Sequence, residues 1–115
     1  MKSVSEDHGE TLLIKLRGKI DIGVGDIQLR RLLDGAVEQG YKNVILDFNK
    51  ISYMDSSGIG ELVADYNRLT QKGIKMAISH LNSKVYDLMT ITRMITVLPI
   101  FDSNEDAMMS LGQAA

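Results

Sequence analysis

A period of two in the apolar residues marks the first clear pattern of the chain, over residues 12–17. Every second residue from Leu12 to Leu16 is apolar, a period of two that predicts a strand with its other face partly covered. Gly18 interrupts this pattern. Residues 7–10, Asp-His-Gly-Glu, have turn chemistry, so residues 2–6 are expected to pair back as a weak edge strand.

Two longer segments carry apolar residues at helical spacing. From Leu29 onward the apolar positions fall at i, i+3, i+4, i+7 and i+8, which predicts an amphipathic helix. Asp26 is its expected N-cap and Gly40 its expected C′ residue. The same spacing recurs over residues 59–69, and Gly73 closes that second helical pattern.

Short apolar runs separate and follow these helices. Residues 44–48 form a run too short for a helix and suited to a central strand covered on both faces. Residues 76–78 predict another buried strand. Pro99 marks the edge of a last short strand at residues 100–101.

Cap residues predict two further helices in the last third of the chain. Asn82 or Ser83 can begin a third helix. Ser103-Asn104-Glu105-Asp106 resembles a capping box in front of a final helix that ends at Gly112. Strands and helices therefore alternate at intervals of about 30 residues, which is typical of βαβ crossovers. The predicted class is α/β, with a mixed, mostly parallel sheet of four to five strands and about four helices packed on it.

Composition narrows the class of protein. The 115 residues suit one domain, residues 1–115, and 44% apolar with 24% charged residues is typical of a globular chain. The net charge is −2 and the cations are scattered, so we expect no nucleic-acid partner. Without cysteine there is no thiol chemistry. The N-terminus lacks a signal-peptide core, and no apolar run approaches the ~18 residues of a membrane span, so we expect a cytoplasmic protein without membrane insertion.

The stretch SYMDSSGIGELV, residues 52–63, lies where an apolar run gives way to a helical pattern. A helix that begins near Ser57 or Gly58 places the positive end of its dipole beside Ser56. One interpretation is that the serine, aspartate and glycine residues of this stretch only cap the helix, which composition alone favours. The other is that Ser56 receives a phosphate, whose charge of about −1.5 to −2 is tolerated there but disrupts an apolar or acidic partner surface.

Catalytic interpretations of this stretch are weak. The segment GIGELV has the first two glycines of a dinucleotide-binding loop, but Val63 replaces the third. A nucleophile elbow is absent because Met54, not glycine, stands two positions before Ser56. His8 and His80 lie in segments that give no reason to bring them to this serine. We therefore expect no enzyme, no cofactor and no metal site.

The residues Asp55-Ser56-Ser57-Gly58-Ile59-Gly60 carry a resemblance to a known family. Together with the preceding strand and with Gly18-Lys19-Ile20-Asp21 after the first strand, they resemble a STAS domain, and more narrowly the bacterial anti-sigma factor antagonists. The likeness covers about residues 10–112. The D-S-S/T-G-[LI]-G pattern is the specific part of it.

This resemblance implies a partner-switching regulator of transcription. In the family, an anti-sigma factor that is also a serine kinase phosphorylates the serine at the position of Ser56. The unmodified antagonist binds the anti-sigma factor and frees the sigma factor, and a metal-dependent serine phosphatase reverses the modification. ATP and divalent metal would belong to these partners.

The resemblance also implies a set of partner-binding residues. Asp21 matches the family's acid near the phosphoacceptor, and Ser57 and Gly58 match the loop that enters the partner's active site. Asp55, the aspartate of the motif, is a further expected partner-binding residue. Because Gly58 has no Cβ, we expect another protein's backbone to approach it closely; a plain turn glycine is the alternative.

Three apolar residues are candidates for a soft contact surface around Ser56. These are Ile22, Met54 and Met89, since methionine adapts to the shape of a partner. Core packing is the favoured alternative for Met89. Residues 22–26, Ile-Gly-Val-Gly-Asp, depart from the more polar residues usual in the family.

Two other functions stay open at this point. A structural STAS module in a larger regulatory or transport-associated complex would have the same fold with Ser56 unmodified. A small nucleotide-binding domain would use Gly58 and Gly60.

Overall fold

The computed structural model describes residues 1–113, so the last two residues of the expected domain, 114 and 115, lie outside it. One sheet has the strand order β1-β2-β3-β4-β5. The first pair is antiparallel and the other pairs are parallel. The strands are β1 (Lys2–His8), β2 (Thr11–Ile20), β3 (Asn43–Met54), β4 (Lys75–Ser79) and β5 (Ile100–Phe101).

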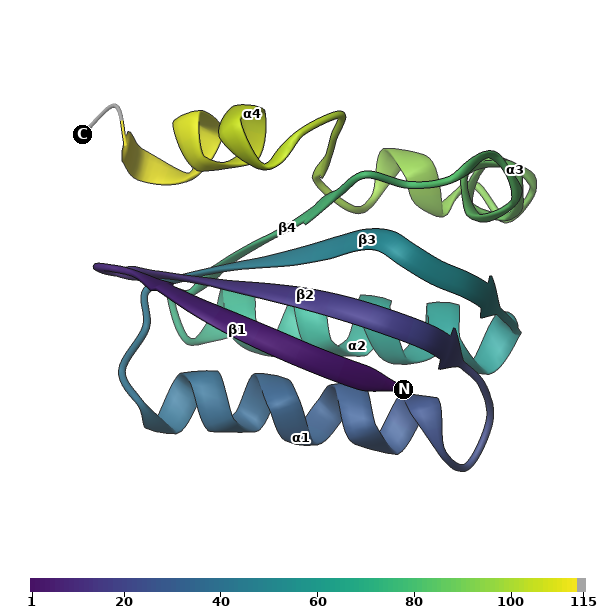
Figure 1. Cartoon of the computed structure of the whole chain (residues 1–115), viewed down its shortest axis with the longest axis horizontal. Coiled ribbons are helices and arrows are strands. Elements are labelled where there is room, and N and C mark those ends of the chain that lie inside the picture. The colour runs from purple at the N-terminus through teal and green to yellow at the C-terminus, as the bar shows by residue number, and fades with distance from the viewer. Residues whose placement is uncertain (114–115) are drawn as a thin grey trace.

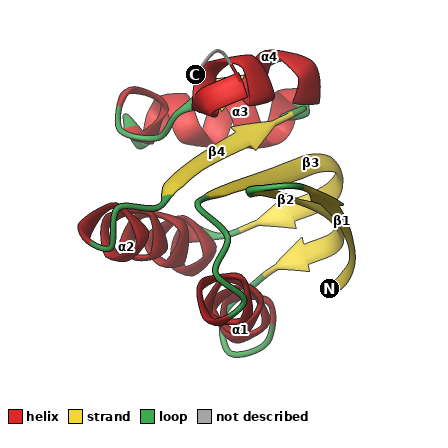
Figure 2. Cartoon of the chain, turned by 90° about the vertical axis from the view of Figure 1, so that its left-hand side faces the viewer, coloured by secondary structure: helices red, strands yellow, loops and turns green. Residues whose placement is uncertain are grey.

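Helices lie on both sides of this sheet (Figure 1). Below the strands in that view are α1 and α2, and above them are α3 and α4; the same separation is visible after a quarter turn (Figure 2). The helices are α1 (Gly25–Glu38), α2 (Ser56–Gln71), α3 (Ser83–Ile91) and α4 (Asn104–Met108), with a 3₁₀ turn at Met94–Thr96 and a π-helical turn at Met109–Gln113. The predicted α/β class is confirmed, including its mixed, mostly parallel sheet.

The first half of β3 is buried on both faces, as its continuous apolar run predicts. Val44, Leu46 and Phe48 belong to the main core, together with buried residues of α1 and α2. Ile45 faces the opposite way and packs with Ala107 of α4 in a second, smaller core. The strand is therefore held from both sides just before it reaches the Ser-Ser-Gly stretch.

Two strand boundaries differ from the prediction. β3 does not stop at residue 48 but continues to Met54, so only Asp55 separates it from α2. β2 continues through Gly18, where φ is +111° and the pairing with β3 shifts register. Gly18 therefore permits an irregularity inside the strand instead of ending it, which is a common use of glycine in sheets.

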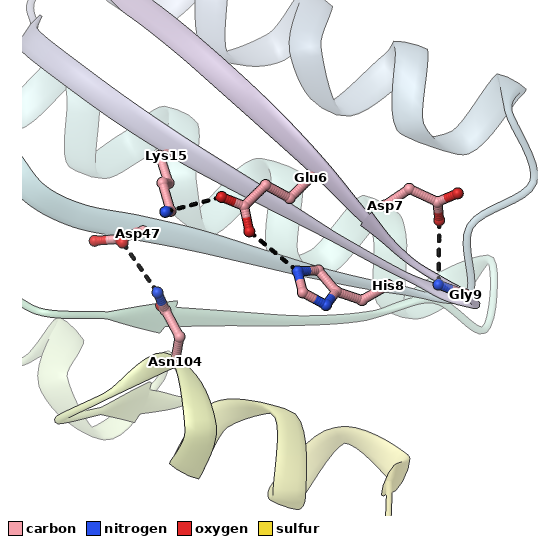
Figure 3. Close-up of polar contacts among 7 residues, drawn as sticks. All are labelled: Glu6, Asp7, His8, Gly9, Lys15, Asp47 and Asn104. Carbon is pink, nitrogen blue, oxygen red and sulfur yellow. Dashed lines mark hydrogen bonds and ion pairs between the residues drawn. The ribbon is translucent and has the colours of Figure 1, made fainter.

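Beyond α4, the second face of the sheet is polar. Glu6 accepts from Lys15 at 2.9 Å and lies 3.2 Å from His8, and Asn104 donates to Asp47 at 3.1 Å (Figure 3). On this side of the sheet, apolar core residues are contributed by α3, through Val85 and Met89, and by α4, through Ala107.

Most predicted helix ends are confirmed. The side chains of Asn82 and Ser103 cap α3 and α4 by accepting from the backbone N–H three residues on. Gly40 and Gly73 have positive φ just past α1 and α2, as C′ glycines do. His80, the residue that follows β4, is half-buried.

Candidate functional site

Asp55 is the single residue between the end of β3 and the start of α2. Its Oδ1 accepts from the N–H of Gly58 at 2.9 Å, which makes Asp55 the N-cap of α2. Its Oδ2 accepts from the N–H of Ile22 at 3.1 Å, so the same carboxylate holds the β2–α1 loop. The capping interpretation is therefore confirmed for the aspartate of this stretch, whereas neither serine supplies the capping oxygen. The helix begins at Ser56, one residue before the predicted start.

Ser56 is the first residue of α2 and is exposed to solvent. The first turn of a helix presents unpaired N–H groups and the positive end of the helix dipole. The hydroxyl of Ser56 therefore lies at a position that favours negative charge and that an enzyme can reach from outside.

Ser57 has a different environment from that of its neighbour. It is half-buried, and its Oγ donates to Asp26 Oδ2 at 2.9 Å, which joins α2 to the first turn of α1. This hydrogen bond is the main cause that lowers the pKa of Asp26. Two consecutive serines thus divide their tasks: Ser57 connects two helices, and Ser56 is left available.

Asp26 is not the N-cap of α1, contrary to the prediction. Val24 occupies the cap position without a side-chain hydrogen bond. Asp21 satisfies the helix start instead, because its Oδ1 accepts from Gly25 N–H and its carbonyl oxygen accepts from Asp26 N–H, both at 3.1 Å. Asp21, expected to act near the phosphoacceptor, therefore orders the loop that faces it.

Gly58 is buried against the chain's own backbone. A Cβ at this position would lie 2.4 Å from the carbonyl oxygen of Ile20 and 2.7 Å from Met54 Cγ. The close approach that we expected from a partner is therefore made by β2 of the same protein.

The apolar surface beside Ser56 differs from the predicted one. Ile22 is 73% exposed, as a contact residue requires, but Met54 is 5% exposed and Met89 is fully buried. Met89 thus belongs to the core, which was the favoured alternative, and only an edge of Met54 reaches the surface. Val24 and Ile27, at 56% and 46% exposed, extend the surface around Ile22 and were missed by sequence reasoning. Their signal was the apolar residues in the loop before α1.

The site is electronegative. Asp21, Asp26 and Asp55 all contribute carboxylates to the two helix starts, and none of them forms an ion pair within residues 1–113. Among the described residues no group of three or more His, Cys, Asp or Glu side chains is arranged to hold a metal ion. The arrangement offers a reachable hydroxyl, apolar contacts and fixed backbone geometry.

Comparison with known families agrees with this fold. The family model described as the STAS domain matches residues 2–107. The chain therefore belongs to the STAS domain family. In the part of the chain that the structure describes, no helix has the length and apolar character needed to span a bilayer.

Individual relatives are similar over almost their whole length. An anti-sigma F factor antagonist of Paenibacillus polymyxa is 29% identical over 107 residues, which cover 92% of this chain and 91% of the relative. The structure of the anti-sigma factor antagonist SpoIIAA in its unphosphorylated form aligns with a TM-score of 0.79 and 21% identity, covering 99% of this chain and 98% of that one. SpoIIAA of Bacillus in the phosphorylated form aligns with a TM-score of 0.69 and 22% identity, covering 95% and 97%.

Proposed function

We propose that this protein is an anti-sigma factor antagonist whose binding to its partner is controlled by phosphorylation of Ser56. The observation that carries the proposal is the division of labour at the start of α2. Asp55, Ser57 and Gly58 are each committed to contacts within the fold, whereas Ser56 is exposed. A phosphate on Ser56 would therefore alter the surface without removing a described internal contact.

The electrostatics of the site favour a change in binding over a change in fold. The dipole and N–H groups of α2 accommodate a phosphate at its N-terminus. Asp21, Asp26 and Asp55 surround that end of the helix with negative charge. A dianion added there increases the negative potential, and a docked apolar or acidic surface would be repelled and forced to desolvate it.

The partner that fits this surface has an apolar recess for the β2–α1 loop. Ile22, Val24 and Ile27 are exposed next to the start of α2, and the bond from Ile22 N–H to Asp55 fixes the loop to the serine-bearing helix. This surface is held in position by contacts inside the fold that involve Asp21, Asp55, Ser57 and Gly58. Met54 packs next to Gly58 under the surface.

The partners would be those of the related antagonists. An anti-sigma factor with serine kinase activity would bind the unmodified protein and phosphorylate it with its own ATP and metal, and a metal-dependent serine phosphatase would reverse the modification. The protein itself would be a substrate and binding partner, without an enzymatic activity or cofactor. The relatives named as anti-sigma factor antagonists support this assignment.

Phosphate incorporation tests the modified residue. The full chain is incubated with the anti-sigma factor kinase from the same cell, ATP and Mg²⁺, and intact mass is recorded. We expect one phosphate on the wild type, none on Ser56→Ala, and one on the matched control Ser57→Ala. Single-site labelling of Ser56→Ala would reject Ser56 as the acceptor.

Partner binding tests the switch itself. Ser56→Asp should weaken binding to the anti-sigma factor at least tenfold, since repulsion across an interface of this kind costs more than the ~1.4 kcal/mol of one decade. The melting temperature should stay within a few degrees of the wild type. Ser5→Asp, on exposed β1, adds the same charge elsewhere and should leave binding unchanged. Equal binding by Ser56→Asp and wild type, with neither phosphorylated in the cell, would point to a structural STAS module instead.

A further inference from the structure

Three carboxyl groups meet along the contact between α1 and α2. Asp65 on α2 is 1% exposed, although aspartate is rarely buried to this degree. Glu61 lies one turn before it and is half-buried. One turn after it, Arg68 donates to Asp65 Oδ1 at 2.6 Å and also to Asp34 on α1.

The guanidinium of Arg68 does not supply hydrogen bonds to all the carboxyl oxygens of this cluster. Within residues 1–113, three buried side-chain oxygens have no hydrogen-bond partner, namely Gln28 Oε1, Glu61 Oε2 and Asp65 Oδ2. Glu61 and Asp65 are four residues apart and lie on the same face of the helix. Ionised carboxylates only accept hydrogen bonds, so two of them side by side would repel and leave both inner oxygens unpaired.

We infer that Glu61 and Asp65 bind one shared proton between their inner oxygens in the folded protein at pH values up to near neutral. The proton converts one carboxyl group into a donor, so Glu61 Oε2 and Asp65 Oδ2 gain a hydrogen bond with each other. It also removes one negative charge. The cluster of Asp34, Glu61, Asp65 and Arg68 then carries a net charge of about −1 instead of −2.

The surroundings of the pair favour the protonated form. Arg68 on α2 is the charged group in contact with the pair, and Arg68 in turn contacts Asp34 on α1. The strands that pack against both helices contribute apolar core residues such as Leu46. Burial and then the neighbouring Glu61 raise the pKa of Asp65 from 3.8 to about 7, against the opposite effect of Arg68.

The shared proton makes stability depend on pH with a definite sign. The unfolded chain releases this proton near pH 4, while the folded chain keeps it until near neutral pH, so folding takes up a proton in between. Stability therefore decreases as pH rises from about 4 to about 7, and this contribution is constant above that range. The same helix α2 begins at Ser56, so the proton contributes to the stability of the helix that carries this serine.

Carbon NMR detects the proton directly. The side-chain carboxyl signals of Asp65 and Glu61 are followed from pH 4 to pH 9 in the folded full chain. We expect the pair to complete its titration only near neutral pH. Two carboxylates that are both ionised from pH 5 upward would overturn the inference.

A substitution tests its energetic consequence. Asp65→Asn supplies a permanent donor toward Glu61 and an acceptor for Arg68. Between about pH 5 and 6.5 the folding equilibrium constant of the wild type should fall up to tenfold more per pH unit than that of the variant. The matched control Asp87→Asn, on an exposed position of α3, should keep the wild-type pH dependence. An identical pH dependence of wild type and Asp65→Asn would overturn the inference, and the NMR titration decides it if the variant does not fold.

Discussion

At the scale of the residue, Gly58 is a position that the sequence motif identifies without revealing its role in packing. The Ser-Ser-Gly pattern marks it in the sequence, but sequence patterns do not reveal that the Ile20 carbonyl of β2 occupies the space where a Cβ would be. That contact joins segments distant in the sequence. By contrast, Ser56 could be predicted correctly as an exposed hydroxyl at a helix start, because the strand and helix patterns meet there.

Gly58→Ala should destabilise the protein by about 1–3 kcal/mol or more, because the backbone of Ile20 must move to admit the methyl group. Urea-induced unfolding measures this change. The matched control is Gly60→Ala in the same helix, where nothing lies within 4 Å of the new Cβ. Its higher helix propensity should make it neutral or more stable by up to about 1 kcal/mol. Equal effects of the two substitutions would contradict the packing explanation.

At the scale of the element, the existence and order of the strands and helices could be predicted from hydrophobic periodicity, but several ends could not. The start of α1 was misplaced because Asp21, a residue outside the helix, supplies the capping oxygen. The end of β3 was misplaced because residues 49–54 lack a continuous apolar run, although they still pair with β2. Pairing across strands is a tertiary property that a single strand's pattern does not contain.

Ser57→Ala should raise the pKa of Asp26 back toward 3.8, because the hydroxyl that stabilises the ionised carboxylate is removed. Since that pKa is lowered in the folded wild type, the stabilisation is present above about pH 4 and is lost as Asp26 becomes protonated. The difference in stability between wild type and variant should therefore decrease as the pH falls below about 4. NMR titration of the Asp26 carboxyl group provides the measurement. Ser56→Ala should leave this pKa unchanged, and an unchanged value in Ser57→Ala would show that the bond does not control it.

At the scale of the whole molecule, strand register creates a row of like charges that composition does not show. Lys2 pairs with Arg17, and Arg17 pairs with Lys50, on three adjacent strands. All three side chains are exposed, and none has an ion pair among the described residues. Like charges directly opposite one another destabilise a sheet. The sequence gives a scattered distribution of cations, and only the fold brings these three together.

Arg17→Glu should therefore stabilise the protein at low salt by a few tenths to about 1 kcal/mol, through attraction to Lys2 and Lys50. The gain should diminish in 1 M salt, where charges are screened beyond about 3 Å. Thermal unfolding at both salt concentrations measures it. Lys15→Glu is the control on the same strand; it removes the ion pair with Glu6 and should be destabilising. A loss of stability in Arg17→Glu at low salt would refute the repulsion.

The direct passage from β3 to α2 has a consequence for how the chain can vary. With a single residue between the last strand position and Ser56, there is no slack to absorb an insertion or deletion. Each residue of an α-helix turns the chain by about 100°. One residue added between β3 and Ser56 would therefore rotate the serine side chain around the helix axis, away from its present direction. The spacing between β3 and α2 therefore sets the direction in which the hydroxyl of Ser56 faces the solvent.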